Sequence, residues 1–66
     1  NGLYKQLGEK VEKARTKAGF TQEELANKAG LHRTYIAGIE TGRRNISVKS
    51  LEKIAKALGI ETNNLL

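Results

Sequence analysis

Four glycines divide this proline-free chain into short segments, and each segment repeats its apolar residues at the spacing of one helical face. The glycines stand at positions 19, 30, 42 and 59. Glycine often follows the last residue of a helix, because it adopts the left-handed backbone conformation without a steric cost. The pattern therefore predicts an all-α fold of five short helices, and no stretch shows the alternation that is typical of a strand.

The first two helices are predicted from an apolar stripe and a cap. Residues 3–18 should form the first helix, whose stripe comprises Leu3, Leu7, Val11, Ala14 and Ala18. Thr21 and Glu24 have the spacing of a capping box, in which each side chain accepts the other residue's backbone N–H. A second helix is expected directly after Thr21, with a narrow apolar face that comprises Leu25, Ala26 and Ala29.

The remaining helices follow the turn at Gly30. A third helix is expected over residues 33–41, with two inward-facing side chains, Ile36 and Ile39. Ser47 or Ser50 should cap a fourth helix, whose inward stripe comprises Val48, Leu51, Ile54, Ala55 and Leu58. Thr62 should cap a last short turn that carries Leu65 and Leu66.

The composition excludes several classes of protein. With 66 residues the chain is expected to be one domain over residues 1–66, held by a small core. It has no cysteine and a single histidine, His32, so neither a disulfide framework nor a metal site is expected. It also lacks a nucleophile–base set and a phosphate-cradling glycine loop, so no enzyme, catalytic residue or cofactor is expected. No apolar run approaches the roughly 18 residues of a membrane span, and we expect a cytoplasmic protein that does not bind membranes.

The net charge of +5 is concentrated in the middle of the chain. Residues 31–50 hold four cationic side chains against one carboxylate. A basic region on a small domain is typical of a nucleic-acid-binding surface, because Lys and Arg release counterions from phosphates. A generally basic protein without that function would show the same net charge.

Residues 22–41 have the spacing of a helix-turn-helix unit. A small residue, Ala26, stands where the two helices would cross, Gly30 makes the turn, and apolar residues fill the wedge between the helices. In such units the second helix enters the major groove of DNA. Together with the basic middle third, the spacing predicts binding to double-stranded DNA.

The chain resembles the phage repressor and Cro family of helix-turn-helix domains over roughly residues 11–66. The resemblance is carried by four features, namely QEELA at 22–26, Gly30, YIAGIETG at 35–42 and ALGI at 57–60. Within that family, the segments RTYIAGIE at 33–40 and RNISVKSL at 44–51 are most similar to controller proteins of restriction-modification systems. The resemblance implies a lambda-repressor-like fold. It also implies a small dimeric transcription regulator that binds palindromic operators near its own gene and the endonuclease gene.

The candidate base-reading residues lie on the third helix, whose N-terminal end points at base edges in this docking geometry. Arg33 is the first candidate, because its guanidinium can bond O6 and N7 of guanine. Thr34 can bond a base or a phosphate. Tyr35 is predicted to offer its hydroxyl to a phosphate, or alternatively to be a half-buried core residue. Ala37 and Gly38 leave the helix almost bare, which predicts close approach of DNA, the alternative being a tolerated glycine in a marginal helix.

Phosphate contacts are expected to frame the groove, because they position a protein without reading sequence. The predicted contacts to the DNA backbone or minor groove are Thr21, Gln22, His32, Arg43, Arg44, Asn45 and Lys49. The resemblance implies that Arg44 lies against the backbone or enters the minor groove. For Arg43 and Lys49 a solvated surface is the alternative, and for His32 the better-supported alternative is an exposed histidine without function.

Three further expectations concern structure and partners. The resemblance implies an ion pair between Arg15 and Glu40 that fixes the angle between two helices. Residues 60–66 are a candidate dimer contact through three apolar side chains, Ile60, Leu65 and Leu66. The expected partners are an operator duplex, a second copy of the chain and RNA polymerase.

The main competing function is a protein-interaction module, such as an antitoxin or adaptor domain. An interaction module would be expected to show an apolar or aromatic patch on the third helix. The predicted outward residues of that helix are Arg33, Thr34, Ala37, Gly38 and Thr41. This composition favours DNA over a protein partner.

Overall fold

A computed structural model describes residues 2–66, and every regular element within them is a helix. The elements are α1 (Gly2–Lys17), α2 (Gln22–Ala29), α3 (Arg33–Glu40), α4 (Val48–Leu58) and a 3-10 helix, η1 (Thr62–Leu65). The expected all-α class is confirmed. The expected count of five α-helices is not, because the last element has only four residues and is a 3-10 helix.

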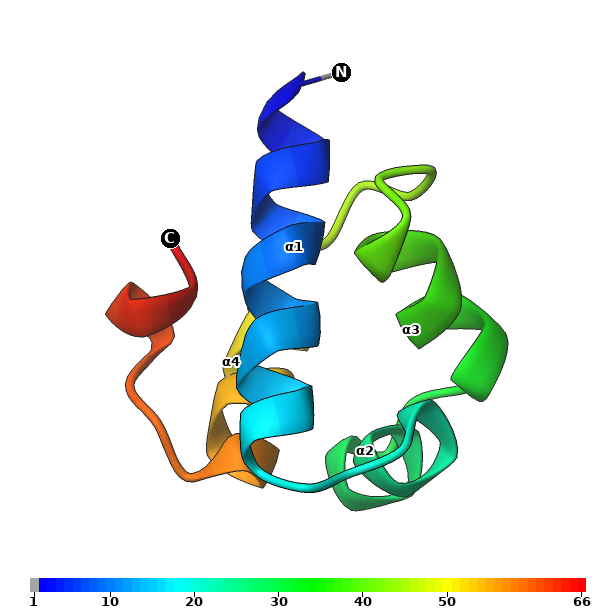
Figure 1. Cartoon of the computed structure of the whole chain (residues 1–66), viewed down its shortest axis with the longest axis vertical. Helices are drawn as coiled ribbons and strands as arrows, with labels where there is room; N and C mark the ends of the chain where they lie inside the picture. The colour runs from blue at the N-terminus through cyan, green and yellow to red at the C-terminus, as the bar shows by residue number, and fades with distance from the viewer. Residues whose placement is uncertain (1) are drawn as a thin grey trace.

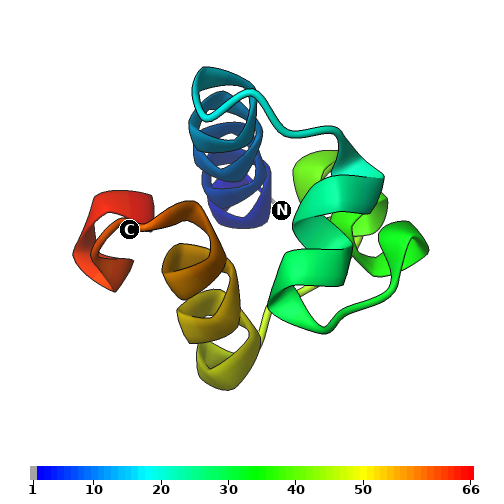
Figure 2. The same cartoon turned by 90° about the horizontal axis from the view of Figure 1, so that it is seen from below.

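The long helix α1 stands between the other elements (Figure 1). In this view α2 and α3 lie on one side of α1, η1 lies on the other side, and α4 runs behind it. The view from below shows the helices arranged around a common centre (Figure 2). α3 packs against α1 and α2, whereas α4 packs against α2 and η1. α3 is therefore held from two sides.

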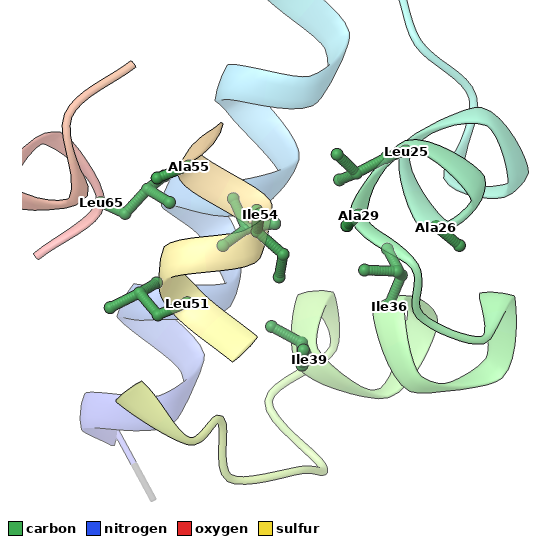
Figure 3. Close-up of a cluster of buried hydrophobic side chains, with 10 residues drawn as sticks. Leu25, Ala26, Ala29, Ile36, Ile39, Leu51, Ile54, Ala55 and Leu65 are labelled. Atoms are coloured by element: carbon green, nitrogen blue, oxygen red, sulfur yellow. The ribbon is translucent and has the colours of Figure 1, made fainter. Parts of the chain in front are cut away.

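Ten buried apolar side chains from all five elements fill the centre (Figure 3). They are Val11, Leu25, Ala26, Ala29, Ile36, Ile39, Leu51, Ile54, Ala55 and Leu65. Three residues expected on inward stripes are instead exposed, namely Leu3 by 68%, Val48 by 73%, and Ala18. Leu3 and Val48 lie in the first turn of their helices, where fewer neighbouring elements remain to cover a side chain, and Ala18 lies just beyond the end of α1.

The predicted helix ends are largely those observed. Thr21 and Glu24 form the capping box, with backbone-to-side-chain distances of 2.8 and 3.1 Å. Gly30 ends α2 in the left-handed conformation, with a φ of 69°. Of the two serines considered for α4, Ser47 is the cap, because its hydroxyl accepts the N–H of Ser50. Thr62 does not cap the last turn; it is the first residue of η1.

Two classes of feature are absent from residues 2–66. None of their helices has the length and apolar character needed to cross a membrane. Over the same residues no group of His, Cys, Asp or Glu side chains could hold a metal ion.

Candidate nucleic-acid interface

The α2–turn–α3 unit is built around a close helix crossing. Ala26 is 1% exposed, so no larger side chain would fit at that point of α2. After Gly30 turns the chain, the N–H of Leu31 donates to the carbonyl oxygen of Ala26 at 2.8 Å. Leu25 and Ile36 are fully buried between the helices. This packing leaves the opposite face of α3 on the surface.

That outer face of α3, together with the loop that follows it, lines a shallow depression. Its lining residues are Arg33, Thr34, Ala37, Gly38, Thr41, Arg43 and Arg44. The α3 depression thus brings together four of the five candidate base readers and two of the candidate backbone contacts. Tyr35 is absent from this lining; it is half-buried and packs against the core, as in the alternative considered for it.

The first turn of α3 is exposed and is capped by an unusual residue. Arg33 and Thr34 are both exposed. The Nδ1 atom of His32 accepts the backbone N–H of Thr34 at 3.3 Å and lies 2.8 Å from the Thr34 hydroxyl. Histidine is not among the preferred N-cap residues. His32 therefore stands at the cap position before the third helix, where Asp, Ser or Thr is more usual, and its side chain makes the cap.

The side chain of Arg44 lies across Gly38, and the close approach of DNA at this glycine stays a prediction. A Cβ atom at Gly38 would stand 2.8 Å from Cγ of Arg44 and 3.2 Å from its Cδ. The backbone N–H groups of Arg43 and Arg44 both donate to the Gly38 carbonyl oxygen, at 2.9 and 3.1 Å. The loop is therefore bonded to the helix at this one residue.

The Arg44 side chain ends above the ring of Tyr35. Its guanidinium carbon lies 5.7 Å from the ring centroid, within the range of a cation–π interaction. Arg44 therefore runs along α3 in this structure rather than away from it. This position puts Arg44 beside the candidate base readers, and its implied contact with the DNA backbone or minor groove stays a prediction.

Arg15 and Glu40 form an ion pair that joins α1 to the C-terminal end of α3. The Arg15 Nε donates to Glu40 Oε2 at 2.7 Å and Nη2 donates to Oε1 at 3.1 Å. The Glu40 side chain is only 3% exposed. The hydrogen bond to Glu40 raises the pKa of Arg15 above its usual value, although burial acts in the opposite direction. The pair therefore joins the two helices through two hydrogen bonds between guanidinium and carboxylate.

Gln22 belongs to this network and does not point away from the protein. Its Nε2 donates to Glu40 Oε1 at 2.9 Å. The phosphate contact expected at Gln22 stays a prediction, while the structure places its side-chain amide on a buried carboxylate. The physical reason is that Glu40 needs more than one donor to offset its burial.

Sequence analysis did not single out Gly8, which sets the distance between α1 and α3. A Cβ atom at this position would lie 2.1 Å from the carbonyl oxygen of Ile39 and 3.0 Å from that of Glu40. Both obstacles are backbone atoms, so they cannot move aside. The one sequence signal was a glycine in the interior of a helical stripe, which costs stability and so indicates a close approach.

The candidate backbone contacts outside the α3 depression are mostly exposed. Asn45 is exposed in the loop before α4, and Lys49 is exposed in the first turn of α4. Thr21 is exposed, but its N–H group and hydroxyl oxygen are engaged in the capping box.

The three side chains of the candidate dimer contact at residues 60–66 differ in how far they are buried. Leu65 is fully buried in the protein's own core, and Ile60 is half-buried, so the expectation of a partner contact is wrong for Leu65. Leu66 is 64% exposed. It lines an apolar hollow between α1 and η1, together with Leu3, Tyr4, Gln6, Leu7, Lys10 and Leu65.

Comparison with known proteins gives consistent results. The helix-turn-helix family HTH_3 matches residues 11–65. Control protein C.BamHI of Bacillus amyloliquefaciens is 46% identical over 67 residues, covering 100% of this chain and 83% of the relative. The crystal structure of the restriction-modification controller protein C.AhdI from Aeromonas hydrophila has a TM-score of 0.98 at 38% identity and covers both chains completely.

A second controller protein of known structure, C.Esp1396I, has a TM-score of 0.88 at 44% identity, covering 92% of this chain and 80% of that one. Structures of this relative also exist for variants in which an arginine, a threonine or a tyrosine is substituted, at three consecutive positions of its chain. The same order of residue types occurs here at 33–35. On these matches the chain belongs to the helix-turn-helix family, as a transcriptional regulator that resembles the controller proteins of restriction-modification systems.

Proposed function

We propose that this protein binds one operator sequence in double-stranded DNA as a dimer, in the manner of a restriction-modification controller. The observation that carries the proposal is the α3 depression. It gathers three arginines, Arg33, Arg43 and Arg44, around a helix face whose other lining residues are small or carry a hydroxyl. Guanidinium groups suit both base edges and phosphates, and small residues between them let a duplex come close.

Roles within the depression are assigned by position. Arg33 stands on the exposed first turn of α3, which meets base edges in helix-turn-helix docking. Arg43, Asn45 and Lys49 lie beyond the other end of the helix, so we assign them to phosphates. The names of the controller relatives support this function. The alternative, a module for binding another protein, is not favoured, because the apolar hollow lies between α1 and η1 rather than on α3.

The test begins with selection of bound duplexes from a random library. Arg33→Ala should then lose about 1–3 kcal/mol of discrimination at one base pair of the selected site. Arg43→Ala and Lys49→Ala should instead weaken binding to all duplexes and flatten its salt dependence. An equal loss on selected and random duplexes for Arg33→Ala would show that another residue reads the site.

The dimer is proposed from the apolar hollow between α1 and η1. Two copies joined there by a two-fold axis would present two α3 helices to a pseudo-palindrome, with the half-sites about 34 Å apart. Leu66→Lys should then shift light scattering at micromolar concentration from dimer mass to monomer mass. Monomer mass for the unaltered protein, both alone and with the selected duplex, would contradict the dimer.

A further inference from the structure

The hydroxyl of Thr34 and its own backbone N–H both point to one nitrogen of His32. The backbone N–H is 3.3 Å from Nδ1, and the Thr34 Oγ1 is 2.8 Å from the same atom. Both side chains are exposed at the start of α3. Thr34 also lines the α3 depression, where the proposed function places a base pair.

The backbone N–H decides which ring nitrogen carries the proton. A backbone N–H can only donate, so Nδ1 must be unprotonated while it caps α3. The Thr34 hydroxyl, 2.8 Å from that lone pair, then donates its proton to the same nitrogen. The Thr34 oxygen then has only lone pairs to offer to a ligand outside the protein, so it can only accept a hydrogen bond. The remaining ring proton of neutral His32 stands on Nε2.

We propose that His32 is a positioning residue that makes Thr34 a hydrogen-bond acceptor toward DNA, so that Thr34 recognises an exocyclic amino group in the major groove. The groups that fit are N6 of adenine and N4 of cytosine, the two major-groove donors. A phosphate does not fit, because it offers only acceptors. The inference rests on the proposed function. The sequence allowed Thr34 to bond either a base or a phosphate, and the inference assigns it to a base.

Protonation of the imidazole would reverse the direction of the hydrogen bond between His32 Nδ1 and the Thr34 hydroxyl. Histidine gains its second ring proton between about pH 8 and about pH 5. A protonated Nδ1 donates to Thr34 Oγ1, which frees the hydroxyl proton to reach guanine or thymine oxygens. The charged neighbours in sequence are Arg33 on α3 and Lys28 in the last turn of α2. Among residues 2–66 no carboxylate lies within ion-pair distance of the imidazole.

The experiment measures base preference at two pH values. The selected operator is varied at each base pair, and dissociation constants are measured by fluorescence anisotropy at constant ionic strength, at about pH 8 and about pH 5.5. Thr34→Val, which removes only the hydroxyl, identifies the base pair that Thr34 reads. At that pair the unaltered protein should prefer adenine or cytosine on the contacted strand by about fivefold at the higher pH. At the lower pH the preference should vanish or pass to guanine or thymine.

His32→Asn is the matched control. The asparagine carbonyl oxygen also caps a helix and accepts the Thr34 hydroxyl, but it does not titrate. This variant should keep the preference for adenine or cytosine at both pH values. Circular dichroism at both values establishes that the helices persist, so a lost preference is not unfolding.

Three outcomes would overturn the inference. They are a preference of the unaltered protein that does not change with pH, the same pH-dependent change in His32→Asn, and a Thr34→Val variant that discriminates as the unaltered protein does. Failure of the proposed function would look different. In that case the unaltered protein would bind selected and random duplexes equally at the higher pH.

Discussion

The two ends of α3 meet very different surroundings, although the whole helix has only eight residues. At the C-terminal end Glu40 is 8% exposed, bonded to Arg15 and Gln22, and its backbone lies against Gly8 of α1. At the N-terminal end the first two residues are exposed, and the side chain that caps the helix is the imidazole of His32. α2, of the same length, begins instead with a complete capping box.

The difference shows how such a short helix can present side chains to a ligand. Isolated helices of eight residues are not stable in water, so α3 depends on its tertiary contacts. Those contacts gather at the buried end, which sets the helix direction through Glu40 and Gly8. The exposed end is left with few contacts inside the protein, and its polar groups remain available to DNA.

The largest effect is expected at the buried end, from Glu40→Ala. This change leaves the Arg15 guanidinium without its partner carboxylate, and removal of one member of a buried pair costs about 3–5 kcal/mol. The full stability of a 66-residue domain is about 3–10 kcal/mol, so we expect the variant to be largely unfolded. Urea denaturation followed by circular dichroism measures the loss. Glu52→Ala, on the exposed face of α4, is the control and should change stability by less than about 0.5 kcal/mol.

Gly8→Ala should have the next largest effect. The added methyl group would meet two backbone carbonyl oxygens, so α1 must move away from α3 at a cost of about 1–3 kcal/mol. Gly2→Ala is the matched control, because nothing lies within 4 Å of a Cβ atom there. If Gly8→Ala and the unaltered protein have the same midpoint of unfolding in urea, the helix crossing does not depend on this glycine.

Gly38→Ala tests the middle of α3 and should act on binding rather than folding. Alanine favours a helix by up to about 1 kcal/mol over glycine, which offsets the displaced Arg44 side chain, so stability should hardly change. Operator affinity should fall about tenfold, because Arg44 would leave the α3 depression. In an Arg44→Ala background the same change should then cost less than about twofold.

The double-mutant cycle separates two reasons for this glycine. If Gly38→Ala costs the same affinity in both backgrounds, DNA itself needs the space, as the sequence first suggested. If Gly38→Ala costs much less affinity in the Arg44→Ala background, the glycine is needed to make room for the Arg44 side chain.

The smallest effect is expected at the exposed end, from His32→Asn. Asparagine is a preferred N-cap, so the free energy of unfolding should rise by about 0.5 kcal/mol. Thermal unfolding measures the shift relative to the unaltered protein, in which the imidazole already caps α3. A fall in stability would mean that the imidazole makes contacts beyond the cap.

Much of the interface could be predicted from local sequence. The spacing from Gln22 to Thr41 predicted two helices and a turn, and the N-terminal position of Arg33 and Thr34 on α3 followed from where that helix begins. The roles of Gln22, Gly38 and Leu65 could not be predicted in this way. Gln22 depends on Glu40 of α3, Gly38 depends on Arg44 in the loop after α3, and Leu65 depends on the shared core.

By itself the sequence determined the helices, their caps and the exposed first turn of α3, because apolar periodicity, capping boxes and left-handed glycines act over a few residues. Only the tertiary structure decided that Arg44 lies along α3 over Gly38, that Gln22 faces the buried Glu40, and that Leu65 is core while Leu3 and Val48 are exposed. Such contacts depend on how far apart the helices pack and at what angle they cross. No local pattern records those quantities, because they result from the fit of all the side chains in the core together.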